Sequence, residues 1–248
     1  MKVIGVIPAR IGSTRVPEKA LADICGMPMV MHAYYRAKMC ALLDEVVVAT
    51  DDEGIMDAVN RGGGKAIMTS ASHRNPTERV HEVSEKIQGD IYMLLNGDEP
   101  LIRPIDIETS LNLLINDLKA SASILYVKNR KFNSPSDFKI VLDNDGHVMY
   151  ISRSDIPSPL KNPADYLQKA YHVMAFYKST LDQYVSYEKQ RLEAIEDHEH
   201  IRLLINGITM VAGEVEYECF SVDTDEQLEW VRAKMPDDKL FQKYRIDN

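Results

Sequence analysis

Two patterns of hydrophobic and polar positions alternate along the first hundred residues. Short, continuous apolar runs, which are typical of buried parallel strands, occupy residues 3–7, 45–50, 65–68 and 90–95. Segments with apolar residues at helical spacing or with helix-capping residues lie between these runs, at 28–40, 51–60 and 75–87. The alternation of strand and helix predicts an α/β fold with a doubly wound, mostly parallel sheet.

The second half of the chain has a different pattern. Strand-like runs at 121–127, 138–142, 148–152 and 171–177 follow one another, with the turn residues Asp143, Asn144, Asp145 and Gly146 between the second and third. A polar loop is expected at 161–167, helices at 179–187, 191–204 and 224–234, and a further strand at 208–212. We therefore expect one domain, with a core formed by residues 1–120 and 205–248 and a smaller antiparallel part at 121–204.

Composition narrows the class of protein. The chain has 248 residues, 45% of them hydrophobic, and a formal net charge of −9, which argues against a nucleic-acid-binding surface. It contains neither an apolar run of 18 residues nor a charged-then-apolar leader, so we expect no membrane span and no signal peptide. The three cysteines, Cys25, Cys40 and Cys219, fit no metal spacing and favour a reducing compartment, by default the cytoplasm.

A cluster of basic and hydroxyl side chains follows the first apolar run. Pro8 ends the run, because proline cannot donate to a sheet ladder, and the next loop carries Arg10, Ser13, Arg15 and Lys19. Ligands of open α/β sheets bind at this carboxyl edge, and the cations suit a triphosphate. The alternative is a solvated basic loop, since the stretch matches neither the dinucleotide nor the P-loop pattern.

Carboxylates are predicted at the same edge. Asp98 and Glu99 follow the strand at 90–95, and Asp223 comes between an apolar residue and a predicted helix. Mg²⁺ is commonly held by one or two carboxylates together with phosphate oxygens, so Asp98 and Asp223 are candidate ligands. The alternatives are an acidic turn for Asp98 and Glu99 and a simple helix cap for Asp223.

Other polar residues give weaker signals. Thr77 and Arg79 lie at a helix start, where free amides attract anions, although Asn75 could simply cap that helix. His198 and His200 are two residues apart in a predicted helix and would face different sides, which makes a poor metal pair. No Gly-x-Ser-x-Gly elbow or Gly-x-Gly-x-x-Gly loop points to nucleophilic catalysis or a dinucleotide cofactor.

Several stretches, taken together and in order, resemble one family. They are IPARIGSTRVPEK, VVVATDD, NGDEP, DFKIVLDNDG, LEAIEDHEHIR and VDTDEQLEWVR, and they span nearly the whole chain. This combination is similar to the CMP-Kdo synthetases (3-deoxy-manno-octulosonate cytidylyltransferases). The resemblance implies a nucleotide-diphospho-sugar-transferase fold whose antiparallel part also forms a homodimer, and an Mg²⁺-dependent transfer of CMP from CTP to an acidic sugar.

The roles implied by the resemblance fall into three groups. Catalysis is assigned to Arg10, Lys19, Asp98 and Asp223, with Mg²⁺ held by Asp98 and Asp223. Binding of CTP is assigned to Pro8, Ala9, Arg10, Ser13, Lys19, His73, Thr77, Arg79 and Asp98, with Arg15 also beside the phosphates. Binding of the acceptor is assigned to Arg15, Asn96, Arg153, Tyr171, His172, Glu199 and His200.

Departures from the family pattern gather in the acceptor stretches. The family commonly has Gln where this chain has Asn96, His-x-Gly-Ile-Tyr where it has residues 171–175, and Leu-Glu-Gln-Leu-Arg where it has 198–202. In the nucleotide half, Glu18 replaces a usual Gly and Pro76 lies in a usual Ser-Gly-Thr. The acceptor is therefore expected to be Kdo or a related small acid, such as a modified Kdo, a nonulosonate or a phosphonate. A nucleotide-binding paralogue without catalysis is the alternative from another class.

Overall fold

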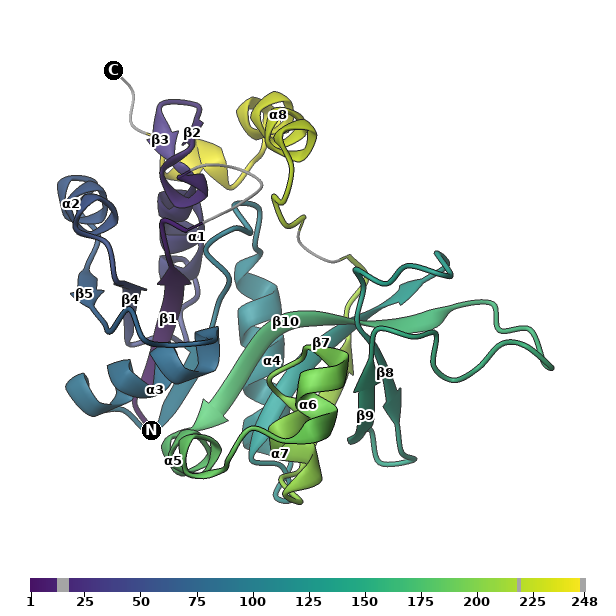
Figure 1. The fold of residues 1–248 in the computed structure, drawn as a ribbon. Helices are drawn as coiled ribbons and strands as arrows, with labels where there is room; N and C mark the ends of the chain where they lie inside the picture. The colour runs from purple at the N-terminus through teal and green to yellow at the C-terminus, as the bar shows by residue number, and fades with distance from the viewer. Residues whose placement is uncertain (13–17, 218–219, 246–248) are drawn as a thin grey trace. The chain divides into compact units, whose positions relative to one another are not determined.

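The computed structural model describes residues 1–12, 18–217 and 220–245 (Figure 1). The chain divides into two compact units, which are described one at a time. The first unit contains Met1–Ile105 and Cys219–Asn248, and the second contains Asp106–Glu218. Among the described residues, no helix has the length and apolar character needed to cross a membrane.

A parallel sheet forms the centre of the first unit. Its strands follow the order β6-β1-β4-β5, with bounds β1 (Val3–Ala9), β4 (Glu45–Thr50), β5 (Ala66–Met68) and β6 (Ile91–Leu94). Ala9 pairs with Thr50, and Thr50 with Met68, so the strands end along a common carboxyl edge. The apolar runs in β1, β4 and β6 are buried, as a sheet covered on both faces requires. The predicted parallel arrangement is confirmed.

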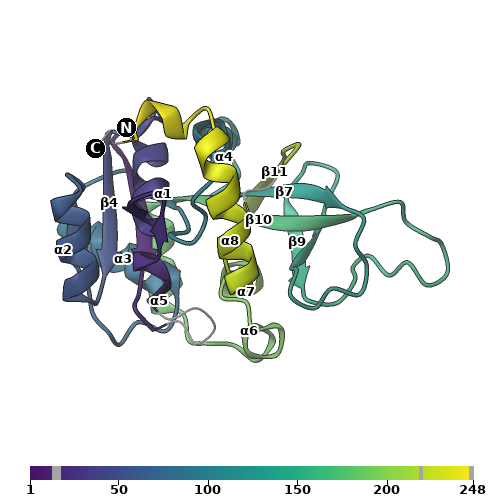
Figure 2. The same cartoon turned by 90° about the horizontal axis from the view of Figure 1, so that it is seen from above.

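Three helices connect these strands, namely α1 (Met29–Lys38), α2 (Glu53–Arg61) and α3 (Pro76–Lys86). The side chain of Asp52 accepts a hydrogen bond from the backbone of Ile55 and begins α2. Asn75 begins α3 in the same way, and Pro76 lies in its first turn. In Figure 2, α2 is seen beside β4, against which it packs. These caps and boundaries agree with the sequence pattern to within a few residues.

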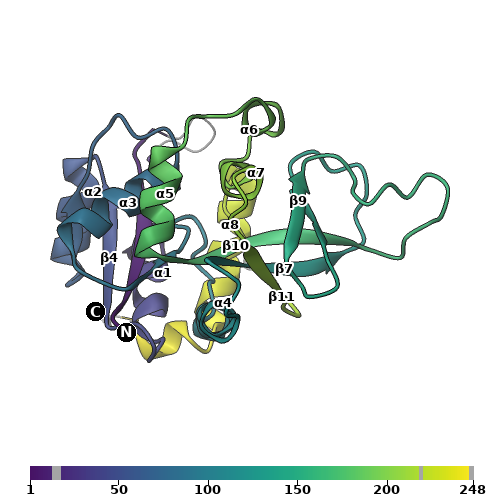
Figure 3. The ribbon, with the colours of Figure 1, turned by 90° about the horizontal axis from the view of Figure 1, so that it is seen from below.

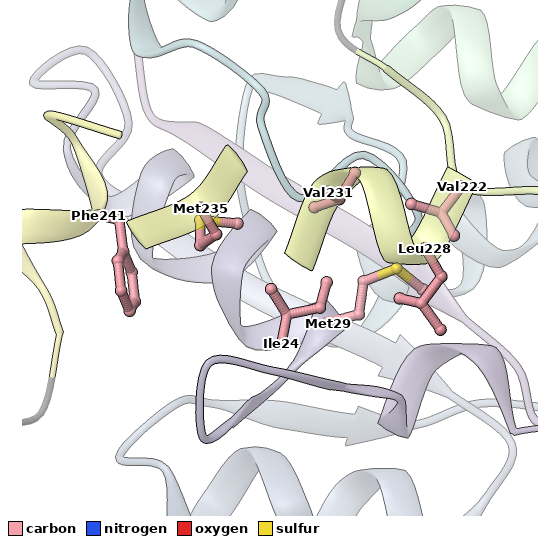
Figure 4. Packing of buried hydrophobic residues seen from close by; sticks show 7 residues of the cluster. All are labelled: Ile24, Met29, Val222, Leu228, Val231, Met235 and Phe241. Carbon is pink, nitrogen blue, oxygen red and sulfur yellow. The ribbon is translucent and has the colours of Figure 1, made fainter. Parts of the chain in front are cut away.

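The C-terminal segment packs onto the first unit through its own apolar cluster. It contains α8 (Asp225–Lys234) and the short helices η2 (Met235–Asp237) and η3 (Phe241–Lys243). It packs against the hairpin of β2 (Asp23–Ile24) and β3 (Met27–Pro28), which follows the short helix η1 (Lys19–Leu21), and Arg232 Nε donates to the carbonyl oxygen of Asp23 over 2.8 Å. Figure 4 shows the buried cluster, which contains Ile24, Met29, Val222, Leu228, Val231, Met235 and Phe241. Burial of this apolar surface fixes the position of the residues just before α8.

The strands of the second unit pair in both antiparallel and parallel fashion. The bounds are β7 (Ala122–Asn129), β8 (Lys139–Leu142), β9 (Val148–Ser152), β10 (Leu167–Tyr177) and β11 (Met210–Glu214). Strand β10 pairs antiparallel with β7 and β8, β8 pairs antiparallel with β9, and β11 runs parallel to β7. The hairpin turn before β9 is confirmed, with Asp143 accepting from the backbone of Asp145 and His147 and with Gly146 at a φ of 86°.

The helices of the second unit differ from the prediction in two places. They are α4 (Pro104–Asn116), which begins at the unit boundary, α5 (Lys178–Ser186), α6 (Arg191–Glu196) and α7 (Ile201–Ile205) (Figure 3). Helix α4 lies where none is predicted, although Ile107, Leu111 and Leu114 are buried at helical spacing. The single helix predicted at 191–204 is wrong, because Asp197 takes a left-handed conformation and separates α6 from α7.

Candidate active site

The loops that follow the strands of the first unit carry the predicted charged residues. Pro8 and Ala9 form the end of β1, and Arg10 follows them with its side chain exposed. Ser13 and Arg15 lie outside the described residues. Glu18 has a left-handed backbone, with a φ of 49°, and directly precedes Lys19 in η1. Left-handed backbone favours glycine, which accounts for the glycine that the family pattern has at this position.

Lys19 joins the two carboxylates that were predicted as metal ligands. Its Nζ lies 2.6 Å from Asp98 Oδ2 and 3.3 Å from Asp223 Oδ1. These three side chains come from positions up to 204 residues apart in the chain. They keep partial contact with solvent, with exposed fractions of 17%, 33% and 37% for Lys19, Asp98 and Asp223. The structure thus brings together three of the four residues assigned to catalysis.

The backbone around Asp98 is fixed by close packing against β1. A Cβ atom added to Gly97 would lie 3.0 Å from the carbonyl oxygen of Pro8, so a side chain there would push the Asp98 loop and the end of β1 apart by a few tenths of an ångström. The backbone N–H of Val222 donates to the carbonyl of Asp98 over 2.9 Å. This bond ties the loop that carries Asp98 to the segment that carries Asp223.

Asp223 does not cap α8, which removes the alternative role considered for it. The N-cap is Thr224, whose side chain accepts from the backbone of Gln227. The Gln227 side chain in turn accepts from the backbone N–H groups of Asp223 and Thr224, at 2.6 and 2.9 Å. This capping box leaves the Asp223 carboxylate to face Lys19.

A second, buried carboxylate supports the site. Glu99 Oε1 accepts from Asn96 Nδ2 at 2.9 Å and from Ser221 Oγ at 3.2 Å, and the Glu99 side chain is buried. Asn96 is therefore held beside the Asp98 loop by Glu99. Ser221 was not predicted from the sequence, because a serine in a loop carries no signal until the fold places it beside Glu99.

The residues assigned to CTP on α3 are held by neighbouring elements of the first unit. Thr77 and Arg79 are buried. The Arg79 guanidinium donates to the hydroxyl of Thr69 and forms an ion pair with Asp51, at 3.2 Å, so it ties α3 to the loops after β4 and β5. His73 pairs with Glu82. Their predicted roles in CTP binding stay predictions.

The residues assigned to the acceptor lie in the second unit, apart from Asn96 and from Arg15, which is not described. Tyr171 is buried, and its hydroxyl donates to Asp106 Oδ2 over 3.3 Å. Arg153 is held by Asp197, with its Nη2 2.9 Å from Oδ2, and by the backbone carbonyl of Glu196 at 3.0 Å. Its guanidinium also stacks over Phe138, 4.2 Å from the ring centroid.

The histidines assigned to the acceptor meet a third histidine that the prediction set aside. His198 and His200 do not lie in one helix, since α6 ends at Glu196 and α7 begins at Ile201. The expectation that they face different sides is therefore wrong. His172 Nε2 lies 2.9 Å from His198 Nε2, and His200 packs against both rings. Glu199 lies beside them, with its Oε1 3.4 Å from His200 Nε2.

The charged side chains at the carboxyl edge of the parallel sheet determine which ligands the first unit can bind. Two carboxylates converge on one ammonium group, and Arg10 adds an exposed cation at the end of β1. Carboxylates so placed suit a hard divalent cation, and the cationic side chains suit phosphate oxygens. A ligand with several phosphates fits such a mixture of charges.

Comparison with known proteins agrees with this chemistry. The model of the family described as "Cytidylyltransferase" matches residues 4–212. The 3-deoxy-manno-octulosonate cytidylyltransferase of Escherichia coli is 40% identical over 236 residues, covering 94% of this chain and 96% of its own. The corresponding protein of Koribacter versatilis is 39% identical over 238 residues, covering 93% of this chain and 89% of its own.

A solved structure gives the same result. The structure of a CMP:2-keto-3-deoxy-manno-octonic acid synthetase complexed with CTP superimposes with a TM-score of 0.90 at 39% identity. The match covers 96% of this chain and 99% of the other. On these matches, the chain belongs to the cytidylyltransferase family, among the 3-deoxy-manno-octulosonate cytidylyltransferases.

Proposed function

We propose that this protein transfers CMP from CTP to the anomeric hydroxyl of Kdo or a closely related acidic sugar. The anomeric oxygen attacks the α-phosphorus of CTP, the bond to the β-phosphate oxygen breaks, and pyrophosphate leaves. The observation that carries the proposal is the convergence of Lys19, Asp98 and Asp223 at the carboxyl edge of the sheet. The names of its relatives and a structural neighbour complexed with CTP support it.

The donor set of this cluster fits Mg²⁺. Asp98 and Asp223 supply the carboxylate oxygens that this ion prefers, and both already face a single positive group, the ammonium of Lys19. We propose that these two carboxylates would hold the ion, with phosphate oxygens and water completing its shell. Bound there, Mg²⁺ would neutralise charge that develops on the phosphates during transfer.

Lys19 and Arg10 would act on the phosphates directly. The Lys19 ammonium lies between the two carboxylates, and with Mg²⁺ bound to them it would donate to a phosphate oxygen instead. Arg10 extends from the end of β1 into solvent and can form a bidentate contact with a second phosphate. Positioning and charge stabilisation are the main sources of rate in phosphoryl-type transfer.

The same transfer to a different small acid is the second candidate. Two side chains assigned to the acceptor are already engaged within the second unit, Tyr171 by Asp106 and Arg153 by Asp197. A third, His172, contacts another ring, that of His198. A pocket built for particular hydroxyls discriminates through its polar groups, so this arrangement favours testing acids other than Kdo.

Pyrophosphate release from CTP and Mg²⁺ tests both candidates. The acceptors are Kdo, an 8-amino analogue of Kdo, nonulosonic acids and phosphonoformate, with a matched series in which Mg²⁺ is replaced by EDTA. Release with Kdo supports the leading function, and release only with another acid selects the second candidate. Release with none of them, in protein that still binds CTP, would contradict both and point to a paralogue without catalysis.

We also propose that the protein is a homodimer, as its family resemblance implies. The second unit exposes large apolar side chains, including Leu160, Ile195 and Leu192, which would be protected in an interface. Light scattering after size exclusion gives the molar mass directly. The mass of one chain across a wide concentration range would contradict the proposal.

A further inference from the structure

Three imidazole rings meet inside the second unit. His172 lies on β10, and His198 and His200 lie in the segment between α6 and α7. One ring nitrogen from each residue lies within 4.8 Å of the other two. The closest pair is His172 Nε2 and His198 Nε2, at 2.9 Å. We call these residues the histidine cluster.

The backbone, rather than the rings, sets the position of the cluster. Asp197 has a φ of 51° and reverses the chain after α6, which brings His198 and His200 to the same side. Glu193 on α6 forms a buried ion pair with Arg202 on α7, with contacts of 2.6 and 2.9 Å. The segment between these two helices is therefore clamped at both ends, and the three rings start from a preorganised geometry.

The surroundings keep the rings neutral. Burial lowers the pKa of His172 to about 4 and the pKa values of His198 and His200 well below their usual range. The positive charges of Lys169, Arg153 and Arg202 lower these pKa values further, for His172, His198 and His200 respectively. Neutral imidazole is the form that binds metal ions.

Packing alone does not explain the buried position of His198. His198 is 5% exposed, and its Nδ1 makes no hydrogen bond in the part of the chain that the structure describes. A buried polar atom without a partner is costly, whereas an apolar side chain at this place would pack against Phe138 without that cost. Packing therefore does not account for the imidazole of His198, and the acceptor role assigned to His172 and His200 does not include it.

We propose that the histidine cluster is a binding site for a divalent transition metal, with Zn²⁺ as the first choice. Three imidazole ligands suit Zn²⁺, Cu²⁺ or Ni²⁺ rather than Mg²⁺, so this site differs in chemistry from the one proposed at Asp98 and Asp223. Tetrahedral ligands at ordinary Zn–N distances are ~3.3 Å apart, so the two closest rings need to separate by only a few tenths of an ångström.

Glu199 is a carboxylate neighbour of the kind that commonly accompanies a metal-binding histidine. Its Oε1 lies 3.4 Å from His200 Nε2, where a carboxylate can accept the ring proton and leave the other nitrogen as the ligand. The carboxylate also offsets part of the positive charge of a bound ion and of the nearby Arg202. The bound metal would tie β10 to the turn between α6 and α7. This inference gives His172, Glu199 and His200 a role other than the acceptor contacts implied by the family resemblance, and its test measures bound metal rather than turnover.

The test uses tag-free protein that has first been stripped of metal with a chelator. The stripped protein is loaded with Zn²⁺ or Co²⁺, passed through gel filtration and analysed for metal content, and Co²⁺ binding is followed by its visible absorption. Wild-type protein is expected to retain one ion per chain with the spectrum of a four- or five-coordinate nitrogen site. His198→Leu, which keeps the volume of the side chain, is expected to lose it.

The matched control is His147→Asn. His147 also pairs with carboxylates, those of Asp117 and Asp143, but it lies outside the cluster, so this variant should retain the ion. Wild-type protein that retains neither metal overturns the proposal whatever the variants do. Equal metal content in wild type and His198→Leu overturns it as well. If His198→Leu does not fold, as judged by near-ultraviolet circular dichroism, His200→Gln takes its place with the same expected loss.

Discussion

The two units each gather a polar cluster from distant parts of the chain, and the clusters differ in charge and exposure. In the first unit, Lys19, Asp98 and Asp223 are charged and reach solvent. In the second, His198 and His200 are buried and His172 is partly buried, and burial and nearby cations keep the three rings neutral.

The difference follows from where each cluster sits in its unit. The carboxyl edge of a parallel sheet is lined by loops, so charged side chains there keep their hydration and can exchange partners with a ligand. The turn between α6 and α7 is covered by β10 and by aromatic rings, so a charge there is costly unless it is paired, as Glu193 and Arg202 are, and the imidazoles are held in their neutral form. The cost of removing water from a charged group thus explains both the charged cluster of the first unit and the neutral cluster of the second.

The largest expected effect is on the clamp beside the histidine cluster. Arg202→Met leaves the buried carboxylate of Glu193 unpaired, and we expect the free energy of unfolding to fall by about 3–5 kcal/mol. Urea denaturation measures the change. The double variant Arg202→Met/Glu193→Leu should recover much of the loss, because no unpaired charge remains. A single variant as stable as wild type would show that the pair does not hold the turn.

Asp98→Ala tests the charged cluster of the first unit. We expect turnover at saturating CTP and Mg²⁺ to fall by about 10²-fold or more, the scale expected when one group that stabilises transition-state charge is lost. Steady-state pyrophosphate release measures it, and circular dichroism checks the fold. Asp225→Ala, which removes an acidic residue in the first turn of α8, is the control and should leave turnover unchanged. Retained turnover in Asp98→Ala would rule out Asp98 as a required ligand.

The pH dependence of stability tests the neutral state of the histidines. The pKa of His172 is about 4 in the folded protein and near its usual 6.5 in the unfolded chain, so the unfolded state binds more protons between these values. Its contribution to stability is complete above pH 6.5 and is lost as the pH falls toward 4, amounting to roughly 2 kcal/mol lost by pH 5.

Denaturation of metal-stripped protein at pH 7.5 and pH 5 measures this change in wild type and in His172→Gln. The variant should lose less stability on acidification, since its amide does not titrate. His32 is also buried, with a pKa of about 4, but it contributes equally to both proteins and cancels from the comparison. Equal losses in the two proteins would show that His172 does not titrate as the structure implies.

The smallest expected effect is that of Lys19→Ala. Loss of one charged donor to a phosphate should lower kcat/KM for CTP about 10–100-fold. Lys19→Arg is the conservative variant and should recover part of the loss, because it keeps the charge but not the compact ammonium between the two carboxylates. An unchanged kcat/KM for CTP in Lys19→Ala would contradict a role at the phosphates.

Much of the fold could be predicted from local pattern. The apolar runs of β1, β4 and β6, the cap at Asn75 and the hairpin turn at Asp143–Gly146 each depend on residues close together in the sequence. Strand and helix alternation then indicated a parallel sheet, and the carboxyl edge of that sheet indicated where Asp98 and Lys19 would lie.

Local pattern failed where a distant contact decided the outcome. Residues 191–204 were predicted as one helix, yet the chain breaks at Asp197. The preceding Glu196 side chain accepts hydrogen bonds from the hydroxyl of Ser152 and from the backbone N–H of Arg153, at the end of β9. Asp223 looked like a helix cap until Thr224 and Gln227 were seen to form the capping box.

The sequence by itself determined the sheet, the residues at its carboxyl edge and, through its motifs, the family. Only the tertiary structure decided that Lys19 lies between Asp98 and Asp223, that Ser221 reaches Glu99, and that His172, His198 and His200 form one cluster. The physical reason is that periodicity and capping are local properties, whereas the meeting of side chains far apart in sequence depends on how buried surfaces pack.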